Sequence, residues 1–311
     1  SVEAVVSVGA VGSVLSGALV VPAEEDGICV RHILKAKLHF STHAVARLTR
    51  AENGITVNGV HARTVDPVHT GDIVAVELNT GGATAPPSAE KAVIVYADRD
   101  ILVVNKRAGM AMYETYNHHG NALSNAVAAA GFDGPFRPIY RLDKDTSGLV
   151  VLARHQLSAA KLAGKVQKDY YAVVPGTYAD SGTVDAPIAH CPDSTVKRQV
   201  DPAGVRAVTH WEALGQQGGR TLLRVQLETG RTHQIRVHFA HLGTPLVGDS
   251  LYGTAPVGTR HLLHCKTIRL MHPVREEPVA FDCPFPSDME EWNLCLPTAP
   301  TTSLPANCCP P

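Results

Sequence analysis

The sequence predicts an α+β fold, with a mixed, mostly antiparallel sheet and flanking helices in the main domain and a small α/β module before it. Two observations support this prediction. Segments rich in β-branched residues outnumber the helical segments and lack the regular spacing of a parallel sheet built from strand–helix–strand units. Residues 81–90 have the Gly, Ala and Pro composition of a linker, and a chain of 311 residues is long enough for a domain on each side.

The small module is expected over residues 28–80, after an apolar N-terminal arm over residues 1–27 that contains a strand. Its helices follow from N-cap residues and apolar spacing, and its hairpin follows from an Asn-Gly pair between two β-rich runs. The expected elements are a helix near Val30–Leu38, a helix from Ser41 or Thr42 to Ala51, a hairpin turn at Asn58-Gly59 and a strand over Asp72–Leu78.

The main domain is expected over residues 91–295, and the Pro-rich residues 296–311 are expected to form a disordered tail. Glycines that follow helical patterns mark helix ends, and runs of Val, Ile and Leu mark strands. The expected elements are a hairpin of Val93–Ala97 and Ile101–Val104, a helix over Asn121–Ala130, a buried strand over Leu149–Leu152, a helix over Ser158–Val166, a strand over Tyr170–Val174, an antiparallel pair of Val208–Leu214 and Leu222–Leu227, and a helix over Thr232–Leu242.

Charge is distributed unevenly along the chain, although the formal net charge is −1. All 28 Lys and Arg lie within residues 28–275, together with 19 of the 29 acidic residues, so this body is basic and both ends of the chain are acidic. A basic body fits a phosphate-bearing partner, and it fits a solvated surface equally well. Charge alone therefore leaves both interpretations open.

Composition excludes several classes of protein. A membrane-spanning bundle is excluded because residues 28–275 hold no uncharged apolar run of about 18 residues. A disordered chain is excluded because 44% of the residues are hydrophobic and can form a core. The seven cysteines show no CxxC spacing, and their odd number argues against a closed disulfide framework and favours a reducing, cytoplasmic location.

The densest group of reactive residue types is the segment Arg141-Leu142-Asp143-Lys144-Asp145-Thr146-Ser147-Gly148, directly before the apolar strand over Leu149–Leu152. A carboxylate beside basic residues, on a loop that leads into a rigid strand, can serve as a nucleophile or a base. The alternative is an ordinary turn in which Asp and Thr cap backbone groups.

Together with two later segments, this loop resembles the RluA-type family of RNA pseudouridine synthases. The family motifs H-R-L-D-x-x-T-S/T-G-L, K-x-Y-x-A and G-R-T/S-H-Q-I/L-R-V-H are matched, in that order, by residues 140–149, by Lys168 with Tyr170 and Ala172, and by residues 230–238. One position departs from the family pattern, because Tyr140 stands where the family usually has His.

The resemblance implies a pseudouridine synthase fold and an isomerase that converts uridine in RNA to pseudouridine without a cofactor or a metal. It implies that Asp143 acts on the ribose as nucleophile or base and that Arg231 pairs with this carboxylate. Tyr170 would stack on the uracil, the alternative being an aromatic residue of the core. Arg141 would fill the space of the flipped base or contact a phosphate. The other substrate-binding residues that it implies are Lys106, Thr146, Lys168, His233, Gln234 and Arg236.

The small module also resembles a known unit, the RNA-binding module of ribosomal protein S-four. Residues 54–59 and Val68 with Gly71-Asp72 match the ending of that module. The resemblance implies an RNA partner and favours structured large-subunit ribosomal RNA, with transfer RNA as the other possibility. A monomer without an obligatory protein partner or a membrane association is expected.

Three other functions remain as alternatives. A noncatalytic RNA-binding or ribosome-assembly protein that keeps the fold would be expected to lack Asp143 or Tyr170, and both are present. A hydrolase would use Asp143 and Asp145 as paired carboxylates. A metal enzyme, which no HExxH string or cysteine pair supports, would take its ligands from His233, His238, His241, His261 and His264.

Overall fold

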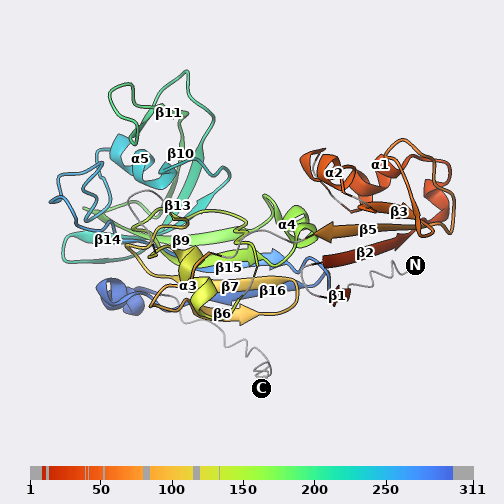
Figure 1. Ribbon diagram of the computed structural model, residues 1–311. Helices are drawn as coiled ribbons and strands as arrows, with labels where there is room; N and C mark the ends of the chain where they lie inside the picture. The colour runs from red at the N-terminus through yellow and green to blue at the C-terminus, as the bar shows by residue number, and fades with distance from the viewer. Residues whose placement is uncertain are drawn as a thin grey trace. The chain divides into compact units, whose positions relative to one another are not determined.

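The computed structural model describes residues 9–11, 14–38, 40, 42–51, 53–79, 85–114, 120–132 and 134–296 (Figure 1). The chain divides into two units. The first comprises Ser1–Asp169 and His264–Pro284, and the second comprises Tyr170–Leu263 and Phe285–Pro311. Residues 81–84 of the predicted linker and 297–311 of the predicted disordered tail lie outside the described residues. No described helix has the length and hydropathy needed to cross a bilayer.

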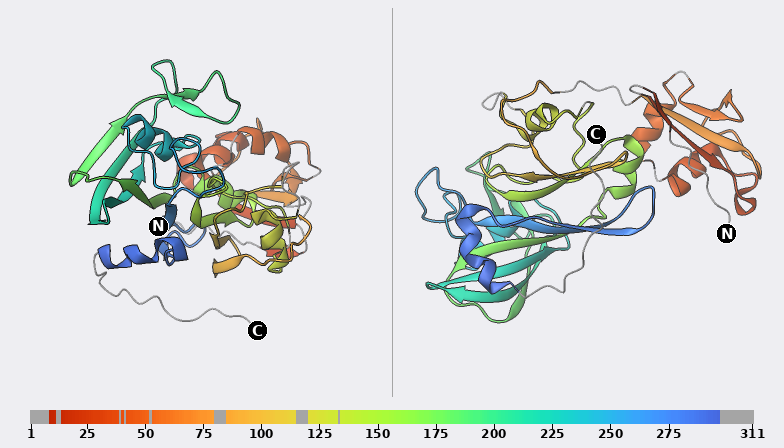
Figure 2. Two further views of the ribbon diagram at one scale, coloured as in Figure 1. Left: turned by 90° about the vertical axis from the view of Figure 1, so that its left-hand side faces the viewer. Right: turned by 90° about the horizontal axis from the view of Figure 1, so that it is seen from below.

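The N-terminal part of the first unit holds a sheet with the strand order β1-β2-β5-β3-β4 (red to orange in Figure 2). The strands are β1 (Gly9–Val11), β2 (Val14–Val20), β3 (Ile55–Val57), β4 (Val60–His61) and β5 (Ile73–Asn79). Strand β2 lies in the predicted N-terminal arm and pairs antiparallel with β5 along its whole length. The predicted hairpin turn is confirmed, since Asn58 and Gly59 have φ angles of 51° and 80°, as a type I′ turn requires.

Short helices accompany this sheet. They are η1 (Ala23–Glu25), which has no buried residue, and α1 (Val30–His32), the π-helical turn η2 (Ile33–Lys37) and α2 (Thr42–Leu48), which bury apolar residues. Ile33 and Leu34 are fully buried in a core cluster with Ile55 and Val74, so the helix predicted near Val30–Leu38 is confirmed. The second predicted helix ends at Leu48, earlier than expected, and the alternative N-cap Ser41 lies outside the described residues.

A second sheet of the first unit has the strand order β15-β8-β7-β6, and β16 also pairs with β15. The strands are β6 (Val93–Ala97), β7 (Ile101–Lys106), β8 (Ser147–Ala153), β15 (Leu263–Met271) and β16 (Pro278–Asp282). β8 runs parallel to β15 and the other pairs are antiparallel, which confirms the mixed, mostly antiparallel sheet. Every residue of β8 is buried, so the strand that follows the Asp143 loop is a rigid support.

Two helices accompany this sheet. The first, α3 (Leu123–Ala129), confirms the predicted helix and is followed by Gly131 at a φ of 88°. The second, α4 (Gln156–Leu162), begins two residues earlier and ends four residues earlier than the predicted helix over Ser158–Val166. Its N-cap is His155, whose ring accepts a hydrogen bond from the Ser158 amide, and Gly164 has a φ of 71°, which a helix cannot accommodate.

In the second unit the strands follow the order β10-β13-β14-β9. They are β9 (Gln167–Pro175), which starts in the first unit, β10 (Ser181–Asp185), β13 (Val208–Gln217) and β14 (Arg220–Leu227), with a separate ribbon of β11 (Ile188–His190) and β12 (Arg198–Val200). The predicted antiparallel pair is confirmed as β13 and β14, and Gly218 and Gly219 in their turn have φ angles of 57° and 71°.

The helices of the second unit are α5 (Gln234–His241) and the 3₁₀ helix η3 (Ser287–Cys295). The predicted helix over Thr232–Leu242 is shorter at its start, because His233 adopts the left-handed conformation with a φ of 58°. Figure 2 shows η3 (blue) beside the strands of this unit, where Trp292 and Met289 are fully buried with Leu222 of β14. This core holds the sheet from which the Arg231 segment emerges.

Candidate functional site

The loop that carries Asp143 is held at both ends in the first unit. At its start, the Tyr140 hydroxyl donates a hydrogen bond of 2.9 Å to the carbonyl of Leu149. Within it, the Thr146 amide donates to the carbonyl of Asp143 at 3.1 Å, and the Thr146 side chain is buried. At its end, the Ser147 hydroxyl lies 2.8 Å from Nδ1 of His264. The Asp143 side chain is half-buried, so the loop combines a fixed backbone with a reachable carboxyl group.

Lys106 at the end of β7 supports the same loop from inside the protein. Its side chain is fully buried, and its ammonium donates to the carbonyls of Arg107 at 3.0 Å, Met110 at 2.9 Å and Lys144 at 2.9 Å. The family resemblance implied that Lys106 binds substrate, and in the structure its ammonium donates to protein carbonyls. It therefore ties the residue after Asp143 to the turn over residues 107–110.

Lys168 lies on the first residues of β9, close to the start of the Asp143 loop. Its ammonium lies 4.6 Å from the centre of the Tyr140 ring and donates to the carbonyl of Val166 at 3.0 Å. Burial lowers the pKa of Lys168, and the nearby Cys265 acts weakly in the opposite direction. The predicted substrate residue Lys168 is thus part of the packing around Tyr140.

Arg141 is exposed beside the Asp143 loop. Burial raises the pKa of the Tyr113 phenol, and the positive charge of Arg141 opposes that shift, which places the two side chains within electrostatic reach of each other. Tyr113 in turn packs edge-to-face on Phe136, with ring centres 5.2 Å apart. An exposed guanidinium beside aromatic rings is suited to contact with a nucleic acid.

In the second unit, Gln234 organises the turn that presents Arg231. Its side chain is buried, and Oε1 accepts hydrogen bonds from the Thr229 hydroxyl at 2.9 Å and the Arg231 amide at 3.0 Å. Its Nε2 donates to the carbonyl of Val208 at 2.9 Å and to the Thr209 hydroxyl at 3.0 Å. The sequence predicted Gln234 as a substrate ligand, but here all of these contacts hold the turn.

The guanidinium of Arg231 is exposed and is held from one side by Arg206. Nε of Arg231 donates to the carbonyl of Arg206 at 3.1 Å. The Arg206 side chain pairs with Glu228 at 2.9 Å, and Glu228 also lies 2.8 Å from Nε2 of His210. The sequence motifs include neither Arg206 nor Glu228, and the available signal was the position of Glu228 directly after β14 and before the Thr229 turn.

The other residues predicted from the same motif have structural partners. Arg236 is buried and forms two hydrogen bonds with Asp249, at 2.7 and 2.9 Å. Nδ1 of His233 lies 2.8 Å from the hydroxyl of Tyr252, whose ring also lies 5.0 Å from the Arg236 guanidinium. These contacts hold the start of α5, and substrate binding by His233 and Arg236 stays a prediction.

Tyr170 is buried on β9, opposite Val225 of β14. Asp143 lies in the first unit, whereas Tyr170 and Arg231 lie in the second. In the first unit, Lys106 and Ser147 hold the loop that carries Asp143. In the second unit, Gln234 holds the turn that carries Arg231.

Two of the histidines considered as metal ligands, His238 and His264, are held by protein groups. His238 is fully buried between the Thr209 hydroxyl and the Ala186 carbonyl, and burial lowers its pKa. His264 lies between Ser147 and the thiol of Cys283, at 2.8 and 3.3 Å. Both ring nitrogens of each of these residues are therefore already occupied by protein groups.

Asp98, Asp100 and His272 come together elsewhere, with potential ligand atoms within 4.8 Å of one another. Asp98 already accepts hydrogen bonds from His272 at 2.8 Å and from the guanidinium of Arg275 at 3.1 Å. A guanidinium in the same site competes with a cation, so this cluster links the turn after β6 to the turn after β15.

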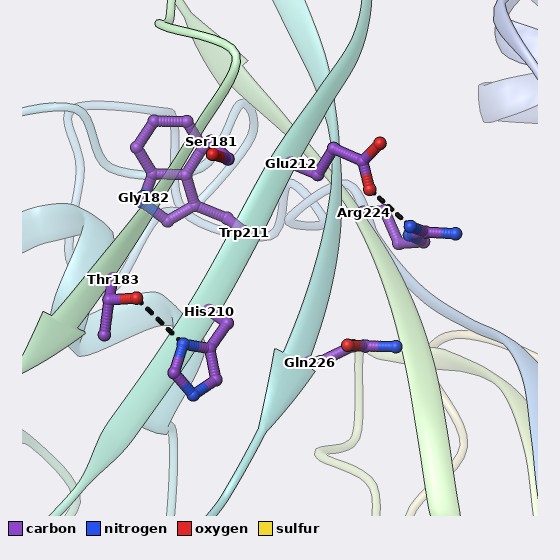
Figure 3. Close-up of a pocket in the computed structure, with 8 residues that line it drawn as sticks. All are labelled: Ser181, Gly182, Thr183, His210, Trp211, Glu212, Arg224 and Gln226. Atoms are coloured by element: carbon purple, nitrogen blue, oxygen red, sulfur yellow. Dashed lines mark hydrogen bonds and ion pairs between the residues drawn. The ribbon is translucent and has the colours of Figure 1, made fainter.

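A hollow of about 340 Å³ lies on the sheet of the second unit (Figure 3). Cross-strand register places Thr183, His210 and Gln226 in one row and Ser181, Glu212 and Arg224 in the next. Figure 3 shows the Thr183 hydroxyl directed at His210 and Glu212 directed at Arg224, which are hydrogen-bonded pairs. These polar side chains of the hollow are therefore hydrogen-bonded in pairs. His210 of the hollow also contacts Glu228, which pairs with Arg206, and the Arg206 carbonyl accepts a hydrogen bond from Arg231.

Comparison with known proteins identifies the family. The profile described as RNA pseudouridylate synthase matches residues 100–241. An uncharacterized RNA pseudouridine synthase of Bacillus subtilis, YjbO, is 36% identical over 250 residues, which are 76% of this chain and 88% of the relative. The ribosomal large subunit pseudouridine synthase D of Pseudomonas aeruginosa is 35% identical over 285 residues, which are 83% of this chain and 88% of the relative. The chain belongs to the RNA pseudouridylate synthase family.

The fold of this pseudouridine synthase agrees with a solved structure, human RNA pseudouridylate synthase domain containing 1. The TM-score is 0.54 at 26% sequence identity, over 68% of this chain and 89% of the human chain. The resemblance to the RluA type and the expected fold class are thereby confirmed. As a member of its family, the synthase is an isomerase that converts uridine in RNA to pseudouridine.

Proposed function

We propose that this synthase modifies uridines in structured large-subunit ribosomal RNA, with Asp143 as its catalytic carboxylate. The observation that carries the proposal is the construction of the Asp143 loop. Buried Lys106, Thr146 and Ser147 fix its backbone, while the Asp143 side chain is only half-buried. Relatives named for large-subunit ribosomal RNA support that substrate over transfer RNA.

The reaction needs few chemical groups. The bond from the ribose anomeric carbon to N1 of uracil breaks, a bond from that carbon to C5 forms, C5 loses its proton, and N1 gains a proton. Reactant and product are isomers, so no oxidant, metal or energy source is required. Asp143 would act on the ribose as nucleophile or base, and an arginine beside it would keep the carboxylate ionised.

Arg231 and Tyr170 are proposed for the other two tasks. Arg231 is exposed on a turn whose backbone Gln234 holds, which fits a guanidinium that must meet a carboxylate. Tyr170 would support the detached uracil by stacking, which tolerates rotation of the base and is worth about 1–3 kcal/mol. Arg141, exposed beside the Asp143 loop, would occupy the space that the flipped uridine leaves in the RNA.

Release of tritium from RNA labelled at C5 of uridine tests the proposal, because the C5 hydrogen is lost only when the new bond forms. The probe is an unmodified transcript of Bacillus subtilis large-subunit ribosomal RNA. Asp143→Asn should lower the rate on the order of 10⁴-fold or more while RNA affinity stays within about twofold. Asp145→Asn, in the same loop, is the matched control and should retain turnover.

Two outcomes would contradict the proposal. Near-normal tritium release by Asp143→Asn would remove this residue from the chemistry. Modification of transfer RNA transcripts alone would overturn the assigned substrate. A transcript carrying 5-fluorouridine separates a catalyst from a noncatalytic RNA-binding protein, because only a catalyst that acts on the glycosidic bond converts the fluorinated base.

A further inference from the structure

Tyr140 links three segments of the first unit around the candidate catalytic loop. Its hydroxyl donates to the Leu149 carbonyl at 2.9 Å, which ties the start of the loop to β8. Burial raises the pKa of the Cys265 thiol on β15, and the Tyr140 hydroxyl acts in the opposite direction, which places the phenol beside this thiol. Its ring lies 4.6 Å from the ammonium of Lys168 on β9. The Tyr140 side chain therefore contacts β8, β15 and β9. In the sequence, Tyr140 directly precedes Arg141.

The contact between Tyr140 and Lys168 involves a charge away from water. Removing an ammonium from water costs free energy unless other groups compensate. Here the compensating groups are the carbonyl of Val166, at 3.0 Å, and the face of the Tyr140 ring. A partly desolvated ammonium over an aromatic ring is bound more strongly than an exposed one. The contact therefore restricts the position of Lys168, because its ammonium is stabilised only above the face of the Tyr140 ring.

This link joins the two segments that carry the proposed chemistry. Tyr140 lies three residues before Asp143, and Lys168 lies two residues before Tyr170 in the continuous strand β9. Residues two apart in a strand point to the same face, so a shift of Lys168 along β9 is passed on to Tyr170. The loop and the strand can therefore be fixed together by one pair of side chains.

We propose that Tyr140 and Lys168 form a positioning pair that couples the Asp143 loop to strand β9, with the Tyr140 ring as the seat of the Lys168 ammonium. The proposal rests on the proposed function of Asp143 and Tyr170. It assigns to Lys168 a role inside the protein instead of on the RNA. It also explains how this chain works with Tyr at a position where its family usually has His, because the phenol supplies both a neutral ring face and a hydroxyl for β8 and β15.

A double-mutant cycle tests the coupling. The variants are Tyr140→Leu, which loses ring and hydroxyl, Lys168→Met, which keeps the length of the side chain without the charge, and their combination. Tritium release from the C5-labelled Bacillus subtilis large-subunit transcript gives kcat and KM. Each single variant should lower kcat about tenfold with KM within about twofold, and the combination should lower kcat no further, because both changes break the same contact.

Tyr140→Phe provides the conservative comparison. It keeps the ring over Lys168 and loses only the hydroxyl, so kcat should remain within about threefold of the wild type. Lys165→Met removes an exposed lysine of the same segment and is the matched control for Lys168→Met, with kcat expected to be unchanged. If Tyr140→Leu does not fold, as its thermal midpoint would show, Tyr140→Phe and Lys168→Met still decide between the outcomes.

Losses that multiply to about a hundredfold in the combination would overturn the proposal, because independent effects add as free energies. A wild-type kcat in Lys168→Met would also overturn it, as would an increase in KM alone, which indicates RNA binding by Lys168. A wild-type protein that releases no tritium would instead contradict the proposed function, so the two failures are distinguishable.

Discussion

Arg236 and Asp249 form a bidentate ion pair inside the second unit, with hydrogen bonds of 2.7 and 2.9 Å. Both side chains are buried, at 8% and 0% exposure. Burial would raise the pKa of Asp249, but the hydrogen bonds and charge of Arg236 outweigh it and hold that pKa below its ordinary value. Asp249 also accepts the amides of Leu251 and Tyr252 at 3.0 Å, so the pair fixes α5 to the loop after it.

Arg236→Met should therefore destabilise the protein strongly, because it leaves the Asp249 carboxylate buried without its cation. The expected loss is about 3–5 kcal/mol in the free energy of unfolding, measured by urea denaturation. Glu212→Gln breaks the half-exposed pair of Glu212 with Arg224 and should cost less than about 1 kcal/mol. Equal losses in the two variants would mean that the buried pair contributes no more than an exposed one.

Gly148→Ala, at the end of the Asp143 loop, should destabilise the protein through a steric clash in addition to backbone strain. Gly148 has a φ of 117°, and an added Cβ would lie 2.2 Å from the carbonyl oxygen of Cys265, where β8 pairs with β15. We expect a loss of about 4 kcal/mol or more in unfolding free energy. Gly109→Ala is the matched control, since Gly109 has a φ of 78° and nothing within 4 Å of an added Cβ. It should cost only about 1 kcal/mol.

The sequence predicted features that depend on adjacent residues better than features that depend on contacts between distant segments. The turn at Asn58-Gly59 and the helix end before Gly131 depend on backbone preferences of adjacent residues, and both were predicted correctly. Strands β10 and β15 were not predicted, and their partners β13 and β8 are distant in the sequence. Strand β16 was also not predicted, although it pairs with the neighbouring β15. β15, for example, places His264 opposite Ser147.

The candidate site shows the same division. The motifs located the segments around Asp143, Tyr170 and Arg231, but they did not distinguish an exposed side chain from one that is buried and holds the backbone. Gln234 and Arg236 share the motif with Arg231 and are buried, whereas Arg231 is exposed. That difference depends on how α5 packs against β13, through contacts such as that of Gln234 with Thr209, which no local pattern records.

Asp98 predicts a specific response of stability to acid. Burial would raise its pKa, but hydrogen bonds from the Ile101 amide, the Tyr96 hydroxyl, the Asp100 amide and His272 outweigh burial and hold the pKa at about 2. The pKa of an unfolded Asp is about 3.9, so the unfolded chain binds more protons between these values. The stabilisation from Asp98 is complete above about pH 4 and is lost as the pH falls towards 2.

Thermal midpoints measured from pH 6 down to pH 2.5 would check this response. The wild type should lose stability over this range, and Asp98→Asn should be less stable at pH 6 but show a smaller further loss. Asp193→Asn, at an exposed aspartate of the second unit, should leave the wild-type slope unchanged. The same slope in Asp98→Asn as in the wild type would show that other carboxylates determine the acid response.

Lys106 links stability to catalysis more directly than the other buried groups. Lys106→Met removes the donor for the carbonyls of Arg107, Met110 and Lys144, of which the Met110 bond is buried and the other two are partly buried. We expect a loss of about 3 kcal/mol or more in unfolding free energy. We also expect a fall of about tenfold or more in kcat at a temperature where the variant is folded, because the backbone beside Asp143 is no longer held.

Lys91→Met, at an exposed lysine of the same unit, is the control and should change neither the free energy of unfolding nor kcat. A stable Lys106→Met with normal kcat would mean that the Asp143 loop keeps its position without this ammonium.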